Sequence, residues 1–148
     1  MPAETVVRDS FAAQGALRLL GAEMVSVGDG RCTIALDHRA DLTQQDGFFH
    51  AGVLTTIADS AGGYAAYSLM PEGSSVLATE FKFNFLRPAT PGRAVAEARV
   101  VKAGRTLTVS AIDVYVEGDA GRSHVATGTQ TCMCLQGSDR SGEVPLEE

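Results

Sequence analysis

One carboxylate inside a long apolar run is the side chain of this sequence best placed to do chemistry. Between residues 53 and 69 the chain has no proline, and its one charged residue is Asp59. Apolar residues recur there near the 3.6-residue period of a helix, and small residues fill most other positions. Such a helix is a buried one, and a carboxylate within it is costly unless it is paired, hydrogen-bonded or used in a reaction.

Asp59 has two interpretations. Most acidic residues lie in solvent, and Asp59 would then belong to an exposed stripe of the helix. Its neighbours three, four and seven positions away on the same face are, however, small and uncharged: Thr55, Thr56, Gly63 and Ala66. A stripe of small residues beside a carboxylate leaves a groove for a ligand or a second subunit, which favours a functional role.

The composition indicates one acidic globular domain. The chain has 148 residues and a net charge of −6, with a pI of about 5.0, which argues against nucleic acid or an anionic membrane as a partner. We assign residues 1–136 to a single domain, with 1–9 loose, and residues 137–148 to a disordered tail.

The sequence also favours a cytoplasmic protein without a bound metal. The N-terminus has no apolar signal segment, and no apolar run reaches the length of a membrane span. The three cysteines lack zinc-ligand spacing and are expected to be reduced thiols, with a structural disulfide not expected.

The first third of the chain reads as a short helix and a hairpin. The helix is expected from about residue 10 to residue 19, with Gly21 ending it. Two strands over 22–27 and 31–36 are joined by a Gly-Asp-Gly turn. Residues 37–49 have no periodicity and form a loop that leads to the long helix.

After the long helix the period changes to two. Phe81, Phe83 and Phe85 alternate with polar residues, which predicts a half-buried strand. Four strands joined by short turns are expected as an antiparallel meander, over residues 76–86, 93–102, 105–117 and 122–135. Only one helix is long enough to cover a face of this sheet, so the pattern predicts an α+β domain whose sheet curls around that helix.

The residues around the long helix resemble those of a known family. Gln44-x-x-Gly47-x-x-His50-x-Gly52, followed by Asp59, is similar to the pattern of hotdog-fold acyl-CoA thioesterases, specifically the PaaI-like branch named for phenylacetic acid degradation. The segments Phe85-Leu86-Arg87-Pro88-Ala89 and Val101-Lys102-x-Gly104-Arg105 resemble the same family, so the resemblance covers roughly residues 19–134. It implies a hotdog fold, a curved antiparallel sheet around one central helix.

The resemblance also implies a mechanism. The backbone N–H at the helix start, that of Ala51 with Gly52 next to it, would hydrogen-bond the thioester carbonyl oxygen. Asp59 would be the nucleophile or the general base that activates water, and Gln44 would hold the water or the thioester group. Two positions depart from the family pattern. Ala51 replaces a glycine, and Ala78 stands where many members have Ser or Thr, with Thr79 one place away.

The same resemblance suggests which residues contact the substrate. Arg87, Lys102 and Arg105 lie at strand ends, where they would bind the phosphates of coenzyme A or be solvated surface cations. Three further residues are candidates for contact with the substrate: His50, Phe48 and Thr79. His50 would alternatively only fix the conformation of the loop. Phe48 would line the acyl pocket or contact a second subunit. No cofactor is expected beyond the coenzyme A of the substrate.

Unpaired strand edges and the resemblance together predict a homo-oligomer, a dimer further assembled as a dimer of dimers, with the site between subunits.

Two other functions compete with acyl-CoA hydrolysis. A hotdog dehydratase or hydratase would need a histidine and an acid at spacings that His50, Asp46 and Asp59 do not show. An acyl-CoA-binding protein without catalysis would have no use for the helix carboxylate.

Overall fold

We describe the fold from a computed structural model, in which residues 1–137 are placed. The predicted disordered tail falls, apart from Gly137, outside these residues. In chain order the elements are α1 (Glu4–Ala13), α2 (Gly15–Leu20), β1 (Glu23–Gly28), β2 (Arg31–Asp37), the 3-10 turn η1 (Ala40–Leu42), α3 (Ala51–Tyr67), β3 (Ser75–Phe85), β4 (Arg93–Ala103), β5 (Leu107–Gly118) and β6 (Gly121–Leu135).

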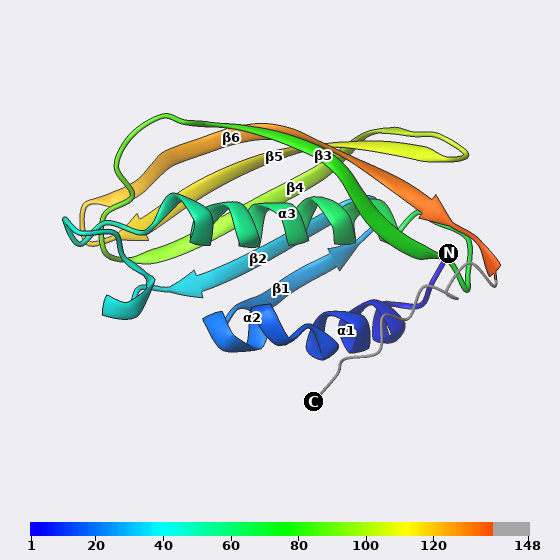
Figure 1. Ribbon diagram of the computed structural model, residues 1–148, viewed down its shortest axis with the longest axis horizontal. Helices are drawn as coiled ribbons and strands as arrows, with labels where there is room; N and C mark the ends of the chain where they lie inside the picture. Colours follow the sequence, from blue (N-terminus) through cyan, green and yellow to red (C-terminus); the bar gives the residue numbers. More distant parts are fainter. Residues whose placement is uncertain (138–148) are drawn as a thin grey trace.

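One six-stranded antiparallel sheet curves around helix α3 (Figure 1), which confirms the predicted α+β architecture. The predicted meander is wrong in one respect, because the strand order is β1-β2-β4-β5-β6-β3. Strand β3 pairs with β6 at the edge of the sheet, and β4 pairs with β2 instead. This arrangement gives the inner strand of the β1–β2 hairpin a partner for its backbone groups, which a separate meander would not.

Small side chains let the helix approach the sheet closely. Ala94 and Ala96 of β4 face the helix and are fully buried, as are Ala58, Ala61 and Ala65 of α3. Alanine on both surfaces leaves little between the two backbones except packed methyl groups. The sheet can therefore wrap around α3, and the helix is covered along most of its length.

Strand β3 is incompletely covered because it lies at the edge. Phe81, Phe83 and Phe85 pair with Gln130, Gly128 and Ala126, so they face the inner side of the sheet as the alternation predicted. Phe81 and Phe85 nevertheless remain 50% and 48% exposed. The pairing skips Thr79, the extra residue of a β-bulge between Ala78 and Glu80.

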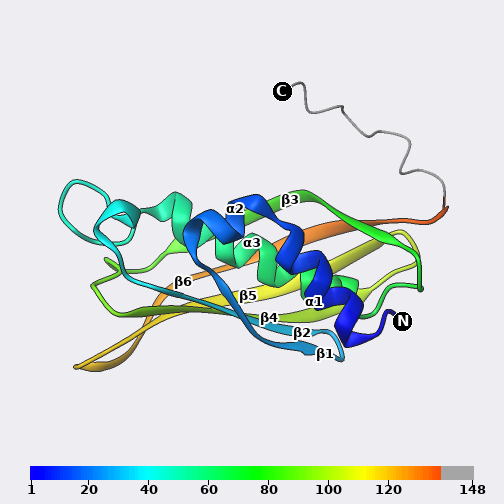
Figure 2. The same cartoon turned by 90° about the horizontal axis from the view of Figure 1, so that it is seen from below.

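The prediction of a loose N-terminus was wrong for residues 4–9. Helix α1 begins at Glu4, and Val7 is buried in the core while Phe11 packs edge-to-face on Tyr64. The reason is an apolar pair four positions apart, which gives a short helix a face to bury. Figure 2 shows α1 and α2 lying over α3 and the β1 edge. Gly21 ends α2 in the left-handed conformation, as predicted.

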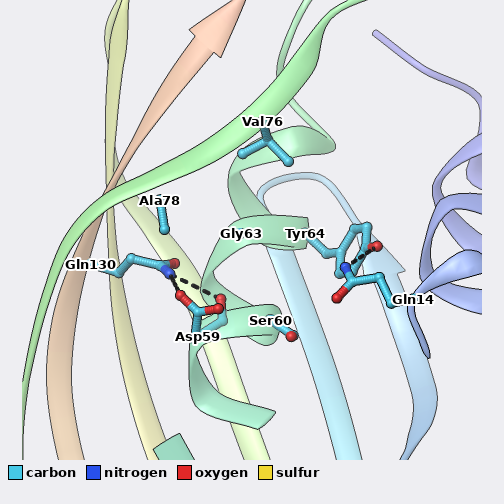
Figure 3. A pocket seen from close by; sticks show the side chains of 8 residues that line it. All are labelled: Gln14, Asp59, Ser60, Gly63, Tyr64, Val76, Ala78 and Gln130. Atoms are coloured by element: carbon cyan, nitrogen blue, oxygen red, sulfur yellow. Dashed lines mark hydrogen bonds between the residues drawn. The ribbon is translucent and has the colours of Figure 1, made fainter. Parts of the chain in front are cut away.

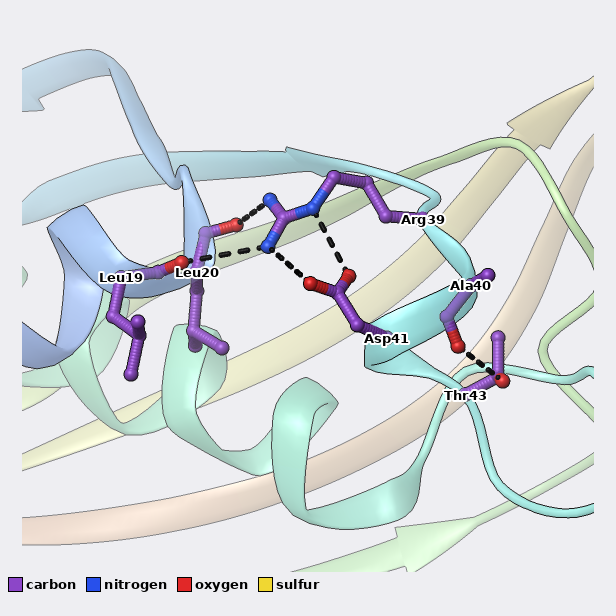
Figure 4. A network of polar contacts seen from close by, with 6 residues as sticks. All are labelled: Leu19, Leu20, Arg39, Ala40, Asp41 and Thr43. Atoms are coloured by element: carbon purple, nitrogen blue, oxygen red, sulfur yellow. Dashed lines mark hydrogen bonds and ion pairs between the residues drawn. The ribbon is translucent and has the colours of Figure 1, made fainter.

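Arg39 ties the loop before α3 to the end of α2. Its guanidinium donates to the main-chain carbonyls of Leu20, at 2.6 Å, and Leu19, and it pairs with Asp41 (Figure 4). These carbonyls have no partner within the helix. The network fixes where the loop that carries Gln44 begins.

The three cysteines have free thiols, with Cys32 and Cys132 buried and Cys134 partly buried. Among the described residues, no helix is long and apolar enough to cross a membrane.

Candidate active site

Asp59 borders a small cavity between helix α3 and the edge of the sheet (Figure 3). The cavity has a volume of about 100 Å³. Its walls come from α3, from Val76 and Ala78 of β3, from Gln130 of β6 and from Gln14 at the junction of α1 and α2. Asp59 is half-buried. Of the small residues expected beside a groove, only Gly63 lines the cavity.

Gln130 is the hydrogen-bond partner of Asp59. Its side chain is 1% exposed. Its amide Nε2 donates to the Asp59 carboxylate and, at 3.0 Å, to the Asp59 main-chain carbonyl oxygen. Sequence reasoning missed this residue. The available signal was a large amide at an inward-facing position of a strand, between Gly128 and Cys132 in the same alternation.

Burial sets the charge state of the groups around this cavity. Burial raises the pKa of Asp59 above its ordinary value, and the hydrogen bond from Gln130 offsets part of that rise. Burial also raises the pKa of Tyr64, against hydrogen bonds from Ser10 and Gln14. The pKa of Cys132 is raised to about 11, first by burial and then by the charge of Asp59. Near neutral pH the tyrosine and the thiol are therefore uncharged.

The N-terminus of α3 presents one free N–H group beside a second, larger hollow. His50 is the N-cap residue, and its Nδ1 accepts from the Gly52 N–H at 2.8 Å. A Cβ at Gly52 would lie 3.0 Å from that nitrogen, so glycine leaves room for the cap. The Ala51 N–H has no acceptor among the described residues. It lies beside a hollow of about 530 Å³.

Gln44 lies at the rim of the same hollow, in a tight loop. Its backbone N–H donates to the Phe48 carbonyl at 2.9 Å. Its side chain bonds to Asp46 through both the amide oxygen and the amide nitrogen. Phe48 also lines the hollow, whereas Phe49 is buried in the core of its own chain and contacts His38. Phe49 also borders the hollow, although only 3% of its surface is exposed.

Within one chain the predicted catalytic residues form two groups. Ala51 and Asp59 are eight residues apart on a helix, which is about 12 Å along its axis. Gln44 and Ala51 line the larger hollow, and Asp59 lines the smaller cavity. A single carbonyl group cannot contact both sets in one chain.

The comparisons with known proteins decide the family. The model of the Thioesterase superfamily matches residues 46–122. This chain belongs to the thioesterase superfamily. A solved thioesterase family protein from Silicibacter pomeroyi shares 48% identity, covers 88% of this chain and 96% of that one, and superposes with a TM-score of 0.87. The predicted hotdog fold is therefore confirmed.

Two further relatives belong to different kinds of thioesterase. A variant of the phenylacetic acid degradation protein PaaI from Thermus thermophilus is 27% identical, covers 81% of this chain and 98% of that one, with a TM-score of 0.71. The 1,4-dihydroxy-2-naphthoyl-CoA hydrolase of Listeria monocytogenes is 26% identical over 70% of this chain and 84% of its own. PaaI-like proteins thus stand among several kinds of thioesterase relative.

The remaining candidates of this thioesterase-superfamily chain are scattered. Thr79 does not line the Asp59 cavity, and its hydroxyl donates to the Thr131 carbonyl at 3.0 Å. Arg87 is exposed and lines the larger hollow. Lys102 and Arg105 lie by the β4–β5 turn, at the opposite end of the sheet from Arg87 (Figure 1). The three cations of one chain cannot bind one pyrophosphate together.

Among the described residues, no cluster of three His, Cys, Asp or Glu side chains could hold a metal ion.

Proposed function

We propose that this chain hydrolyses an acyl-CoA thioester to a free acid and coenzyme A, as the PaaI-like thioesterases do. The observation that carries the proposal is the Asp59 carboxylate, half-buried in a cavity on the central helix of a thioesterase-superfamily fold. The relative from Listeria is named for hydrolysis of an aromatic acyl-CoA, which supports the substrate class.

The proposed roles follow from what each group can donate or accept. The free Ala51 N–H donates a hydrogen bond to the thioester carbonyl oxygen and stabilises the oxyanion that forms on attack. Asp59 either removes a proton from the attacking water or attacks the carbonyl carbon itself, giving an anhydride that water then cleaves. In both routes the C–S bond breaks and coenzyme A leaves as the thiol. Gln44 orients the water or the thioester, and His50 and Gly52 fix the backbone that carries the Ala51 donor.

A second copy of the chain is needed to bring these groups together. Strand β3 is the edge of the sheet that the described residues form, and it carries exposed phenylalanines. A two-fold antiparallel pairing of two β3 strands sets the Phe85 end of one beside the Ser75 end of the other. The larger hollow lies at the Phe85 end, and the Asp59 cavity is walled by Val76 and Ala78 near the Ser75 end. The pairing therefore joins the helix N-terminus of one copy to the carboxylate of the other.

The dimer also gives the cations a consistent assignment. Arg87 beside the larger hollow is our candidate for a coenzyme A phosphate ligand. Lys102 and Arg105 would reach the same ligand from the second copy, since the pairing reverses the ends of the sheet. We further propose assembly of two such dimers and a cytoplasmic location, where the free thiols stay reduced.

The proposal is tested by thiol release from short, long and aromatic acyl-CoAs. We expect turnover with at least one class, and a loss of about 100-fold or more for Asp59→Asn with an unchanged circular dichroism spectrum. Near-normal turnover by Asp59→Asn would remove the assignment of the carboxylate. Binding of acyl-CoA without any thiol release would instead indicate a non-catalytic binding protein.

A further inference from the structure

Gln130 is placed to control both the direction and the charge of the Asp59 carboxylate. Its Nε2 bonds to the carboxylate and to the main-chain carbonyl oxygen of the same residue. Two acceptors on one residue fix the amide relative to Asp59 rather than letting it swing between positions. The amide reaches across from β6, and Gln130 is only 1% exposed, so its side chain has little access to bulk water.

The orientation of the Gln130 amide is determined on one side by the hydrogen bond to the Asp59 carboxylate and on the other by the room beside Gly62. An ionised carboxylate only accepts hydrogen bonds, so the NH₂ side of the amide must face Asp59. The Oε1 side has no hydrogen-bond partner among the described residues. It lies against helix α3 at Gly62, where a Cβ would collide with Oε1. Gly62 therefore provides the space that the amide occupies.

A buried donor aimed at a carboxylate favours the ionised form of that carboxylate. We propose that Gln130 is a positioning residue that holds the Asp59 carboxylate ionised and aimed for thioester cleavage, and that Gly62 keeps the Gln130 amide in place. This inference rests on the proposed function, because it assigns a supporting group to the same reaction. A purely structural tie between β6 and α3 would leave the pH dependence of the reaction unchanged.

Few other groups can titrate at this cavity. Tyr64 from the helix and Cys132 from β6 are its titratable neighbours among the described residues, and β3 contributes Val76 and Ala78. The pKa of Tyr64 is raised, and that of Cys132 is raised to about 11. Both are uncharged across an assay from pH 5 to 9. In the proposed dimer the second copy also brings Asp46 and His50 toward the site, so Asp59 is identified by the displacement of the acidic limb of kcat/KM when Gln130 is changed, because the Gln130 amide contacts the Asp59 carboxylate.

The central experiment is the pH profile of Gln130→Leu, in which an apolar side chain of similar size fills the buried site. Losing the donor disfavours the ionised carboxylate, so we expect the acidic limb of kcat/KM to move up by about one pH unit. At pH values well below the limb, activity should fall about tenfold more than it does on the plateau at higher pH. Gln130→Glu places a second carboxylate beside Asp59 and should move the limb further in the same direction.

Three more variants separate this effect from a loss of folding. Gly62→Ala leaves Gln130 present but displaces its amide, so it should move the limb in the same direction as Gln130→Leu. Combining the two substitutions should add little, because both remove one interaction. Thr129→Ser is the matched control, since Thr129 is the adjacent β6 residue and is exposed on the other face.

The outcomes distinguish this inference from the proposed function. A displaced limb in the Gln130 and Gly62 variants, with Thr129→Ser unchanged, supports the positioning role. If Gln130→Leu does not fold, Gly62→Ala and Gln130→Glu provide the same readout. An unmoved limb in folded variants, while Asp59→Asn is inactive, overturns the inference about Gln130 alone. Turnover by Asp59→Asn overturns the proposed function together with it.

Discussion

At the scale of residues, the charge that the proposed reaction needs also lowers the stability of the fold. Burial raises the pKa of Asp59 from its ordinary value of 3.8. The unfolded chain therefore loses this proton at a lower pH than the folded chain does. The free energy of unfolding falls as the pH rises from about 3.8 to the higher folded pKa, and the loss persists above it.

The Asp59→Asn variant should remove this penalty. An asparagine oxygen still accepts from Gln130, but no charge has to be buried. We expect the melting temperature at pH 7 to rise by about 2–4 °C, as for a gain of about 1 kcal/mol in a domain of this size. Near pH 3 and below, the difference should largely vanish, because Asp59 is then mostly neutral in both states. Calorimetry at both pH values checks this. An equal difference at pH 3 and pH 7 would contradict the burial argument.

Ala51 permits a test of a single backbone donor. It is the first helical residue, where proline is tolerated because its N–H has no partner within the helix. His50 before it is already extended, as a residue preceding proline must be. Ala51→Pro should therefore fold normally and lose about 10²–10³ in kcat, the usual effect of removing one oxyanion donor.

Ala51→Gly is the matched control, because it keeps the N–H and changes only the methyl group. Its kcat should stay within a few-fold of the parent protein. Full activity of a folded Ala51→Pro protein would show that the carbonyl is held by another group. Steady-state thiol release and a thermal melt of each variant are the measurements.

At the scale of elements, β3 depends on a single neighbour. Within residues 1–137 it pairs with β6 alone, and Gly128 of β6 leaves room for the Phe83 ring and the Lys82 carbonyl. A methyl group at Gly128 meets both. We expect Gly128→Ala to lower the free energy of unfolding by about 1–3 kcal/mol, as in other overpacked sites.

Urea denaturation checks the Gly128 prediction, with Thr129→Ala as a control on the exposed face of the same strand. The control should change the free energy of unfolding by less than about 0.5 kcal/mol. Equal effects of the two substitutions would show that Gly128 has no special packing role.

Periodicity predicted the long helix and all six strands to within a few residues of their ends. Periodicity could not predict three features of the structure. The place of β3 beside β6 depends on which strand completes the hairpin, and a local pattern holds no information about that choice. Helix α1 rests on one apolar pair, Val7 and Phe11, too short to count as a period. The Thr79 bulge shifts the phase of β3, so alternation counted across it assigns the wrong face.

The sequence named candidate residues for a site, but it could not give their geometry. Asp59 was identified because it is a charge within an apolar helix, and the structure places it at a cavity. The Ala51 and Gln44 positions came from family resemblance, and one chain keeps them in a different hollow from Asp59. Gln130 was missed because its contact with Asp59 joins residues 71 positions apart.

At the scale of the whole molecule, the two hollows predict complementation between inactive chains. In the proposed dimer each site takes Ala51 from one copy and Asp59 from the other. Heterodimers of Ala51→Pro and Asp59→Asn would then contain one intact site and one doubly altered site. Coexpression of the two variants should restore about a quarter of the parent activity, because half of randomly formed dimers are heterodimers.

Each variant expressed alone provides the baseline for complementation, and light scattering confirms that dimers form. Recovery that is absent despite mixed dimers would place both groups of a site in one chain. A monomeric parent protein with full activity would contradict the shared site altogether.

The bulge at Thr79 has a consequence for how the sequence of β3 is aligned with those of relatives. Ala78 pairs with Cys132 and Glu80 with Thr131, so the extra residue stands outside the ladder. A homologue without it would keep the same side chains facing inward before and after that point. A one-residue gap at Thr79 in an alignment would then change the bend of the strand, but not the residues that meet across it. Alignments that avoid this gap by shifting β3 would exchange its inner and outer faces.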